Sequence, residues 1–358
     1  MILTQIDISG FRNIRNASLL PAPGFNLITG SNGAGKSTIL EAIHCLSVGH
    51  SFRTRKVREL ITCGGDEFTL ACQMFDAQAE QEHRSGLRRH RDGTTELRLN
   101  YEEIRSMATV TQLLPVKALT PDSHKLIQDG PSERRQFIDW GSFHMEPGFL
   151  DAWRIYRRCL AQRNQSLKDN VPDSEITTWD DQLIDSGEAL DGFRRHYIES
   201  LQAMLAKLLE SMDSSFHVEL SYRSGWTDGL SLADALAKSF ANCRRFRTTT
   251  VGPHRGELNI STDGVLARQI LSRGQQKLLV YAMHLAQLIA LQEKTNRPAI
   301  ILCDDLPSEL DAEQCAKILS QISLLNSQVF LTCTDAPNLP ETPVESFIVT
   351  NGEVQKQV

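Results

Sequence analysis

The spacing of hydrophobic and polar residues changes its period twice along the chain. Residues 1–9 alternate around Ile6 and Ile8, and residues 25–29 form a short β-rich run that ends at Gly30. Alternation of this kind, bounded by a glycine, is typical of β-strands. The same alternation returns at later apolar positions, which are Phe68, Leu70, Cys72 and Met74. The pattern therefore predicts that the chain opens with strands.

The middle of the chain, from about residue 149 to 247, has helical periodicity instead. Its apolar residues recur every three or four positions, as the buried face of a helix requires. They are Phe149, Trp153, Tyr156, Leu160, Leu190, Phe193, Tyr197, Leu201, Met204, Leu208 and Met212. A polar connector at 169–180 contains Pro172 and suits the turn of a helical hairpin. We therefore predict a mostly helical segment here.

Strand-like runs return after about residue 248. They lie at 258–260, 299–303 and 328–332, and a helix-compatible segment separates the last two. Short apolar strands that flank a helix predict a βαβ unit in a parallel sheet covered on both faces. Near the C-terminus, Asn351-Gly352 lies between two strand-like runs and predicts a hairpin.

These periods together predict the fold class, an α/β protein with a mostly helical inserted second lobe. The chain has 358 residues, which fits roughly two domains at about 150 residues each. The expected boundaries are 1–145 for the first part of the α/β domain, 146–247 for the helical lobe and 248–358 for the second part.

Composition narrows the class of protein. The chain is 41% hydrophobic and 23% charged, which excludes collagenous and disordered chains. Its eight cysteines are spread singly, so we expect reduced thiols and a cytoplasmic protein. No signal peptide is evident, and the longest apolar stretch, 278–291, is too short for a membrane span. The formal net charge is -6, so contact with nucleic acid would need local basic patches.

A phosphate-binding motif follows the second predicted strand. Residues 30–37 read Gly-Ser-Asn-Gly-Ala-Gly-Lys-Ser and fit G-x-x-x-x-G-K-[ST], with a helical run after them. The glycines let backbone N–H groups surround a phosphate, Lys36 reaches its outer oxygens, and the Ser37 hydroxyl can bind Mg²⁺. The motif predicts a nucleotide-binding loop.

An apolar strand at 299–303 ends in two carboxylates, Asp304 and Asp305. P-loop NTPases use acids at such a position to hold Mg²⁺ and to orient the attacking water. We assign Asp304 to the Mg²⁺ shell and Asp305 to the water as its base. Acid pairs at strand ends are also common solvated turns, and the phosphate loop favours the catalytic interpretation.

A second candidate anion site is Leu271-Ser-Arg-Gly-Gln275, which stands before a long helix-compatible run. Ser272 and Gly274 can cap that helix while its free N–H groups point outward. The alternative is an ordinary helix cap.

The order of these motifs resembles the ABC-type ATPase heads of the SMC group, and within it the RecF family of bacterial DNA replication and repair proteins. The matching segments run in family order along nearly the whole chain: 10–13, 32–37, 120–122, 130–140, 252–255, 271–275 and 304–311. The block at 131–140 is the most family-specific.

The resemblance implies an ABC-type P-loop ATPase head that binds ATP and Mg²⁺. It implies catalytic roles for Lys36, Asp305 and Ser272, and metal binding by Ser37 and Asp304. The implied nucleotide contacts are Gly30, Ser31, Asn32, Gly33, Ala34, Gly35, Lys36, Ser37, Thr38, Arg12, Asn13, Ser272, Gly274 and Gln275. The implied function is an ATP-switched homodimeric DNA clamp with weak, DNA-stimulated hydrolysis. The clamp would act in recombinational repair, replication restart and the SOS response. Its substrates would be single- and double-stranded DNA near gaps, and its partners would be the RecO and RecR proteins.

The sequence also departs from ABC ATPases in general. Transporter-type members have a Gln between lobes and a switch His, whereas Asp122 and Thr334 lie near those places here. Asp305 stands where most carry Glu, and the shorter acid predicts slow turnover. Arg273 fills the variable signature position, and Asp129 replaces a small residue before Gly130.

Three basic clusters are candidates for contact with DNA phosphates. They are Arg53-Thr-Arg55-Lys56-Val-Arg58, the segment 84–91, and Arg244-Arg245-Phe-Arg247. We favour the first, which follows the phosphate-loop helix closely, although charge runs are often only solvated surface. His254, beside Pro253, suits either a nucleotide contact or a structural turn.

Two other functions remain as alternatives. One is the ATPase subunit of a transport or other protein-remodelling complex, against which the missing switch His and the 131–140 block argue. The other is a small-molecule kinase, which the second helix-start motif disfavours.

Overall fold

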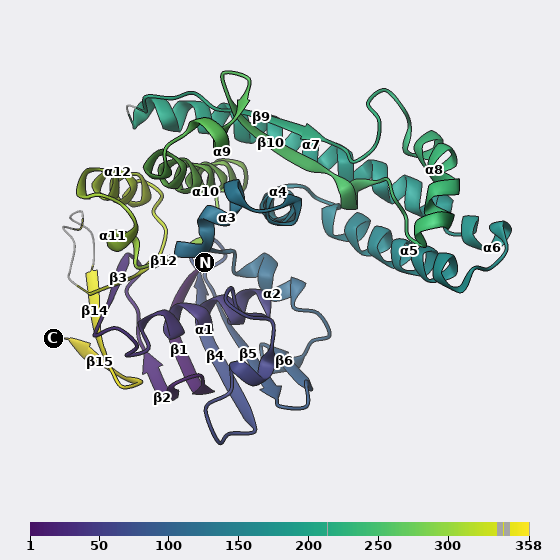
Figure 1. Ribbon diagram of the computed structural model, residues 1–358. Coiled ribbons are helices and arrows are strands. Elements are labelled where there is room, and N and C mark those ends of the chain that lie inside the picture. Colours follow the sequence, from purple (N-terminus) through teal and green to yellow (C-terminus); the bar gives the residue numbers. More distant parts are fainter. Residues whose placement is uncertain (213, 335–338, 340–343, 358) are drawn as a thin grey trace. The chain divides into compact units, whose positions relative to one another are not determined.

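The computed structural model describes residues 1–212, 214–334, 339 and 344–357. It divides into two compact units, whose elements are drawn in Figure 1. The head unit comprises Met1–Ser123 and Lys277–Val358, and the inserted unit comprises His124–Gln276. The α/β head is therefore interrupted by an insertion.

One sheet of the head unit is built mainly from parallel strands. Its order is β15-β14-β3-β13-β12-β8, and only β15 runs antiparallel to its neighbour. The strands are β3 (Phe25–Thr29), β8 (Val116–Leu119), β12 (Ile300–Asp304), β13 (Val329–Cys333), β14 (Val344–Thr350) and β15 (Glu353–Gln357). The predicted βαβ unit is confirmed as β12, α12 (Ala312–Ser323) and β13, and the predicted hairpin is confirmed as β14 and β15.

The second sheet of the head unit is antiparallel, in the order β2-β1-β4-β5-β6-β7. Its strands are β1 (Ile2–Phe11), β2 (Ile14–Leu19), β4 (Glu67–Asp76), β5 (Gln81–His90), β6 (Thr95–Leu99) and β7 (Glu102–Glu103). Helix α1 (Lys36–Val48) contacts strands of both sheets. Side chains of β1, β4, α1, β12 and β13 form one hydrophobic cluster, so the core of the head unit surrounds α1.

Further helices complete the head unit. They are η1 (Val57–Glu59), α2 (Ala108–Leu113), α11 (Leu306–Glu309) and most of α10 (Arg273–Thr295), whose first turn belongs to the inserted unit. The 3-10 turn η2 (Pro121–His124) lies at the unit boundary. No described helix has both the length and the apolar character needed to cross a membrane. All eight cysteines are free thiols.

The inserted unit is mostly helical but also contains an antiparallel sheet, β11-β10-β9. Its helices are α3 (Lys125–Gln128), α4 (Pro131–Met145), α5 (Phe149–Asp169), α6 (Asp173–Thr177), α7 (Asp180–Ser211), α8 (Leu232–Phe246), η3 (Pro253–Arg255) and α9 (Ala267–Ile270). Its strands are β9 (Glu219–Arg223), β10 (Glu257–Thr262) and β11 (Val265–Leu266). Helices α5 and α7 form the predicted hairpin.

The insertion differs from the sequence-based expectation in two respects. Strand β9 lies inside the stretch predicted to be helical, because it pairs along its whole length with β10. The sequence does carry a signal for this strand, since Phe216, Val218, Leu220 and Tyr222 alternate with polar residues, and the helical prediction missed it. The inserted unit also extends beyond the expected limits of 146 and 247, because α4 packs on α7 and on β10. The block 131–140 and the segment 271–275 therefore belong to this unit.

Candidate nucleotide-binding site

The phosphate loop connects β3 to α1, as the sequence predicts. Gly35 is the N-cap of α1 and provides no side-chain cap. The N–H groups of Thr38 and Ile39 bond to the Gly35 carbonyl, at 3.1 and 3.4 Å. In the described part of the chain the N–H groups of Lys36 and Ser37 make no backbone hydrogen bond. Unpaired N–H groups at a helix start form a ready anion site.

Lys36 folds back over this loop. Its ammonium donates to the carbonyl oxygens of Gly30 at 2.7 Å and Ser31 at 3.2 Å. The side chain is largely buried, and its charge is therefore held beside the free N–H groups. A phosphate placed there meets a fixed cation and backbone donors together.

Two glycines of the loop are required by close backbone contacts. A Cβ at Gly30 would lie 2.4 Å from the carbonyl oxygen of Val349, on the neighbouring strand β14. A Cβ at Gly35 would lie 2.8 Å from Nδ2 of Asn13. Both residues also have positive φ angles, 150° and 119°, which disfavour side chains. The loop conformation thus depends on glycine at these two places.

The resemblance assigns Arg12 and Asn13 to nucleotide contact. In the structure Asn13 bonds to the phosphate loop and to α1, and Arg12 pairs with α1. Asn13 Nδ2 donates to the Ala34 carbonyl at 3.0 Å, and its Oδ1 accepts from the Thr38 hydroxyl at 2.9 Å. Arg12 forms an ion pair with buried Glu41, at 2.5 Å. These bonds hold the loop to the turn between β1 and β2, and direct contact of Arg12, Asn13 and Thr38 with nucleotide stays a prediction.

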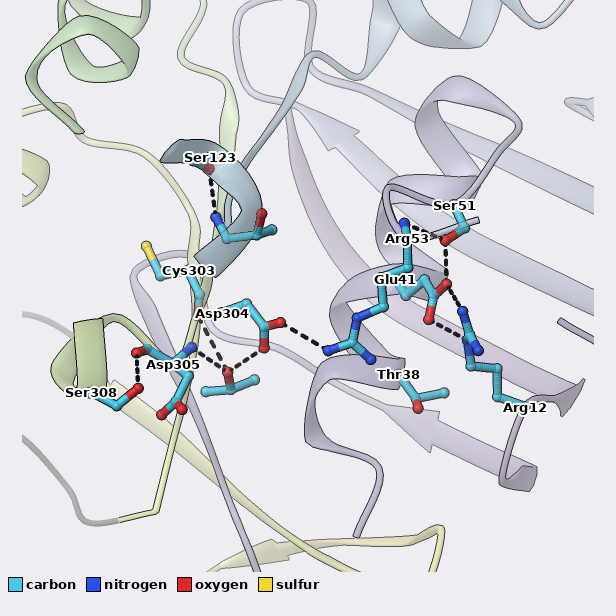
Figure 2. A network of polar contacts seen from close by, with 12 residues as sticks. Arg12, Thr38, Glu41, Ser51, Arg53, Ser123, Cys303, Asp304, Asp305 and Ser308 are labelled. Carbon is cyan, nitrogen blue, oxygen red and sulfur yellow. Dashed lines mark hydrogen bonds and ion pairs between the residues drawn. The ribbon is translucent and has the colours of Figure 1, made fainter. Parts of the chain in front are cut away.

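The two adjacent acids occupy different environments at the end of β12 (Figure 2). Asp304 is buried, and its Oδ1 accepts from the Thr332 hydroxyl at 2.9 Å. Asp305 is part-exposed, and its backbone N–H donates to the same hydroxyl at 2.9 Å. Thr332 is the register partner of Asp304 on the parallel strand β13. The sequence predicted both strands but assigned Thr332 no role, although the carboxyl ends of neighbouring parallel strands meet at one edge.

The oxygen atoms at this site suit an Mg²⁺ ion that is bound together with a phosphate. Mg²⁺ prefers oxygen ligands and usually binds through one or two protein groups plus substrate phosphates. Asp304 offers a buried carboxylate, and the half-buried Ser37 hydroxyl has no hydrogen-bond partner among the described residues. The described residues contain no group of three or more His, Cys, Asp or Glu that could hold a metal ion alone. A metal held jointly by protein and phosphate fits this set.

The segment 271–275 begins α10, as predicted, and its hydrogen bonds form a capping box. The Ser272 hydroxyl accepts from the Gln275 N–H at 3.3 Å, and Gln275 Oε1 accepts from the Ser272 N–H at 2.9 Å. Ser272, Arg273 and Gly274 are exposed, and a Cβ at Gly274 would touch nothing within 4 Å. The structure thus shows a helix cap on an open surface, and phosphate binding there stays a prediction.

The basic clusters are partly neutralised. Arg53 pairs with Asp304 at 3.2 Å, and Lys56 pairs with Glu59 at 3.0 Å. In the second cluster the ion pairs are Arg88 with Glu67 and Glu96, and Arg91 with Asp66. In the third cluster Arg244 pairs with Asp173. Within the favoured cluster, only Arg55 and Arg58 form no ion pair with any described residue, so contact with DNA by all four residues stays a prediction.

His254 has structural partners at both ring nitrogens. Nε2 lies 3.0 Å from the Thr249 carbonyl, and Nδ1 lies 2.6 Å from the Tyr156 hydroxyl. A carbonyl only accepts, so Nε2 carries the proton and Nδ1 accepts from Tyr156. Burial lowers the pKa of His254 to about 4, which keeps the ring neutral. Of the two interpretations, the geometry favours the structural turn.

Comparison with known proteins places the chain in a family. The model of the RecF/RecN/SMC N terminal domain matches residues 2–355. The DNA replication and repair protein RecF of Shewanella baltica (strain OS155) is 39% identical over 358 residues, with 99% of each chain covered. The chain belongs to the RecF/RecN/SMC family. The RecF protein of Thioalkalivibrio sulfidiphilus (strain HL-EbGR7) is 39% identical over 347 residues, with 97% of this chain and 96% of that protein covered.

Solved structures agree with this assignment. A structure described as the recombination mediator protein RecF-ATP in the RecFOR pathway matches with a TM-score of 0.90 and 27% identity, covering 99% of this chain and 97% of that one. An Smc head bound to the C-winged helix domain of ScpA matches with a TM-score of 0.60 at 16% identity, covering 100% and 97%, and shows the fold alone. The resemblance to bacterial RecF and the predicted ATPase-head fold are confirmed.

Proposed function

We propose that the chain is an ATP-dependent DNA-binding protein of replication and recombinational repair. One observation carries the proposal: an uncapped helix start, the folded-back Lys36 and the buried Asp304 all belong to the head unit, beside its parallel sheet. Its relatives support the biological role, since they are described as DNA replication and repair proteins. The structural relative described as RecF-ATP supports the nucleotide.

The proposed chemistry is ATP hydrolysis. Mg²⁺, when bound, would offset phosphate charge, and Ser37 and Asp304 would hold it. Lys36 and the N–H groups of α1 would bind and orient the phosphates. Asp305 would accept a proton from the attacking water, since its carboxylate is more accessible than that of Asp304. Its short side chain supports slow turnover.

The proposed output is a switched dimer. One chain offers two helix starts as candidate phosphate sites, at α1 and α10, and one nucleotide would occupy the first. Ser272, Gly274 and Gln275 of α10 are arranged on an accessible surface, where they can cap an ATP that a second copy holds. ATP would then drive a symmetric homodimer, which doubles every basic patch.

The dimer would act as a DNA clamp. A chain of net charge -6 has no general attraction for DNA, so doubled local patches would have to supply it. We expect ATP hydrolysis to be weak and to be stimulated by DNA. We also expect the clamp to bind preferentially at gaps between single- and double-stranded DNA, with RecO and RecR as its partners. The RecFOR pathway named for the structural relative supports these partners, and a cytoplasmic location follows from such a role. Family membership favours this function over a transport ATPase subunit.

The test combines sedimentation with DNA binding. Mass and DNA affinity are measured without nucleotide, with ADP and with a non-hydrolysable ATP analogue, on single-stranded, duplex and gapped DNA at low and moderate salt. We expect ATP to produce a dimer and to strengthen DNA binding, with little base preference and a steep loss of affinity as salt rises. Equal DNA affinity with and without ATP would contradict the clamp.

A further inference from the structure

The turn of the C-terminal hairpin reaches the phosphate loop, which lies near the opposite end of the sequence. Asn351 and Gly352 connect β14 to β15, and this hairpin is drawn in yellow in Figure 1. The hairpin and the loop both belong to the head unit. The N–H group of Gly352 donates to the carbonyl oxygen of Ala34 at 2.9 Å. The hairpin therefore bonds directly to the backbone that would surround a phosphate.

The turn can approach the loop this closely only because residue 352 is glycine. A Cβ at Gly352 would lie 2.1 Å from the carbonyl oxygen of Asn13, far inside contact distance. Asn351 and Gly352 also have positive φ angles, 49° and 83°, which is typical of a two-residue Asn-Gly turn. A larger residue at position 352 would therefore move the turn away from the loop.

The position of the turn is set by the core of the head unit. β14 pairs in parallel with β3, the strand that leads into the phosphate loop. The Thr29 hydroxyl donates to the Phe347 carbonyl at 3.4 Å. Phe347 and Val349 are buried in the hydrophobic cluster that surrounds α1. The hairpin is therefore held in place by contacts that need no nucleotide.

The Ala34 carbonyl accepts a second hydrogen bond, from Asn13 Nδ2 at 3.0 Å. A carbonyl oxygen has two lone pairs, so the bonds from Asn13 and Gly352 use both of them. In a trans peptide the carbonyl and the following N–H group point in opposite directions. The Gly35 N–H group is thus directed away from Asn13 and Gly352, and it makes no hydrogen bond within the described part of the chain. It is a further unpaired donor beside those in the first turn of α1.

We infer that the Asn351-Gly352 turn is a positioning element for nucleotide: it holds the Ala34 carbonyl away from the phosphate site and so presents the Gly35 N–H group to a phosphate. Glycine is conformationally permissive, so the peptide between Ala34 and Gly35 needs an outside restraint to keep one orientation. If this peptide turned over, its carbonyl oxygen would face the phosphate and repel it. The inference rests on the proposed function, and it gives the C-terminal hairpin a role in ATP binding.

The first test measures steady-state ATP hydrolysis by Gly352→Ala. The added methyl group displaces the turn and breaks its bond to Ala34, so the KM for ATP should rise roughly fivefold, as expected for the loss of one hydrogen bond. The kcat should stay within about twofold of wild type, because Asp304 and Asp305 are not altered. A substitution that only destabilised the fold would reduce the amount of active protein, which lowers the apparent kcat and leaves the KM unchanged.

Gly264→Ala is the matched control. Asp263 and Gly264 form the two-residue turn of the β10–β11 hairpin, and their φ angles are also positive, 52° and 74°. A Cβ at Gly264 would meet nothing within 4 Å, so this variant carries the same kind of backbone strain without a clash. Its KM should equal that of wild type.

A second variant keeps the inference testable if Gly352→Ala does not fold. Asn351→Ala strains the same turn, because alanine disfavours a positive φ, but it adds no atom against Asn13. This variant should have a higher KM than Asp263→Ala, which makes the same kind of change in the β10–β11 turn. Equal KM values in these two variants would contradict the inference.

The second test isolates the phosphates of the nucleotide. Inorganic triphosphate, which lacks the base and the sugar, competes with a fluorescent non-hydrolysable ATP analogue for the loop. Gly352→Ala should lose affinity for triphosphate and for the analogue by the same factor, because the turn acts on phosphate donors alone. Weaker binding of the analogue with unchanged triphosphate affinity would overturn the inference, because the turn would then act on the base or the sugar.

The outcomes separate this inference from the proposed function. Failure of the wild-type protein to bind the analogue contradicts the proposed function itself. If the wild type binds and hydrolyses ATP but Gly352→Ala keeps the wild-type KM, the turn has no positioning role, whatever the kcat. A KM that rises equally in Gly264→Ala also overturns the inference, because backbone strain in any turn would then have the same effect.

Discussion

The helix starts of α1 and α10 use the same backbone groups in opposite surroundings. The start of α1 has no side-chain cap, and hydrogen bonds from Lys36 and Asn13 hold its loop in place. The start of α10 is capped by its own Ser272 and Gln275 and faces solvent. A helix N-terminus carries about half a positive charge in either place.

The difference shows that the helix dipole alone does not define a nucleotide site. At α1 the donors are preorganised by neighbours that are distant in sequence, including the Val349 carbonyl that restricts Gly30. At α10 the cap is formed by Ser272 and Gln275 themselves, and among the described residues no lysine folds back over this helix start as Lys36 does at α1. We therefore expect a single chain to hold nucleotide at α1, whereas the proposed phosphate contact at α10 would need a partner that brings the phosphate to it.

The largest expected effect is on ATP affinity, and it comes from removing Lys36, the cation at the start of α1. Lys36→Ala should abolish measurable ATP binding, because a charge-assisted hydrogen bond contributes ~1.5–3 kcal/mol and the loop also loses its internal bonds to Gly30 and Ser31. Nucleotide affinity is measured by fluorescence titration. Lys238→Ala, at an exposed position of α8, serves as the control. An affinity of Lys36→Ala within twofold of wild type would show that ATP does not bind at this loop.

The next largest effect is expected on ATP hydrolysis, and it distinguishes ATP binding at α1 from hydrolysis by Asp305. Asp305→Asn should bind ATP normally but release phosphate about 10²- to 10⁴-fold more slowly, because a general base is lost. Asp305 has a positive φ of 55°, and asparagine tolerates that conformation, so the backbone is preserved. Asp263→Asn makes the same change at a positive-φ turn in the inserted unit. Unimpaired phosphate release by Asp305→Asn would place the base elsewhere.

A third change tests the exposed start of α10. Ser272→Arg should lose ATP-induced dimerisation while the monomer still binds ATP, because a bulky cation would occupy the contact surface. Ser231→Arg is a matched control, since Ser231 also caps a helix and accepts from Asp234 N–H at 3.1 Å. Each variant loses about 1 kcal/mol of capping, so only the effect on dimerisation should differ. Both variants are sedimented with ATP, and an ATP-induced dimer of Ser272→Arg would show that α10 does not cap the ATP of a second copy.

The smallest effect concerns the stability of the inserted unit. Burial lowers the folded-state pKa of His254 to about 4, below the unfolded value of about 6.5. The unfolded state therefore binds more protons between pH 6.5 and 4, and the stabilisation by His254 is lost as pH falls through that window. The unfolding free energy of His254→Gln should approach that of wild type on acidification, by at most about 1.4 kcal/mol per pH unit. A difference that stays constant from pH 7 to 4 would show that His254 does not titrate this way.

Much of the fold and part of the site were predictable from local patterns. The strand, loop and helix around 30–37, the strand that ends in Asp304 and the Asn351-Gly352 hairpin each depend on residues close together in sequence. Periodicity also located α5 and α7. Such features follow from backbone conformation and one-sided burial, which neighbouring residues determine.

Contacts between distant segments were decided only by the tertiary structure. The run 53–58 looks like a uniform basic patch in sequence, yet Arg53 neutralises a carboxylate 251 positions away, and Thr332 satisfies the same group from a neighbouring strand. Packing also decided which strand pairs with β9, because its partner β10 lies elsewhere in the sequence. Side-chain charge and local period are properties of the sequence, whereas which charges meet, and which strand finds a partner, depends on the three-dimensional packing of the chain.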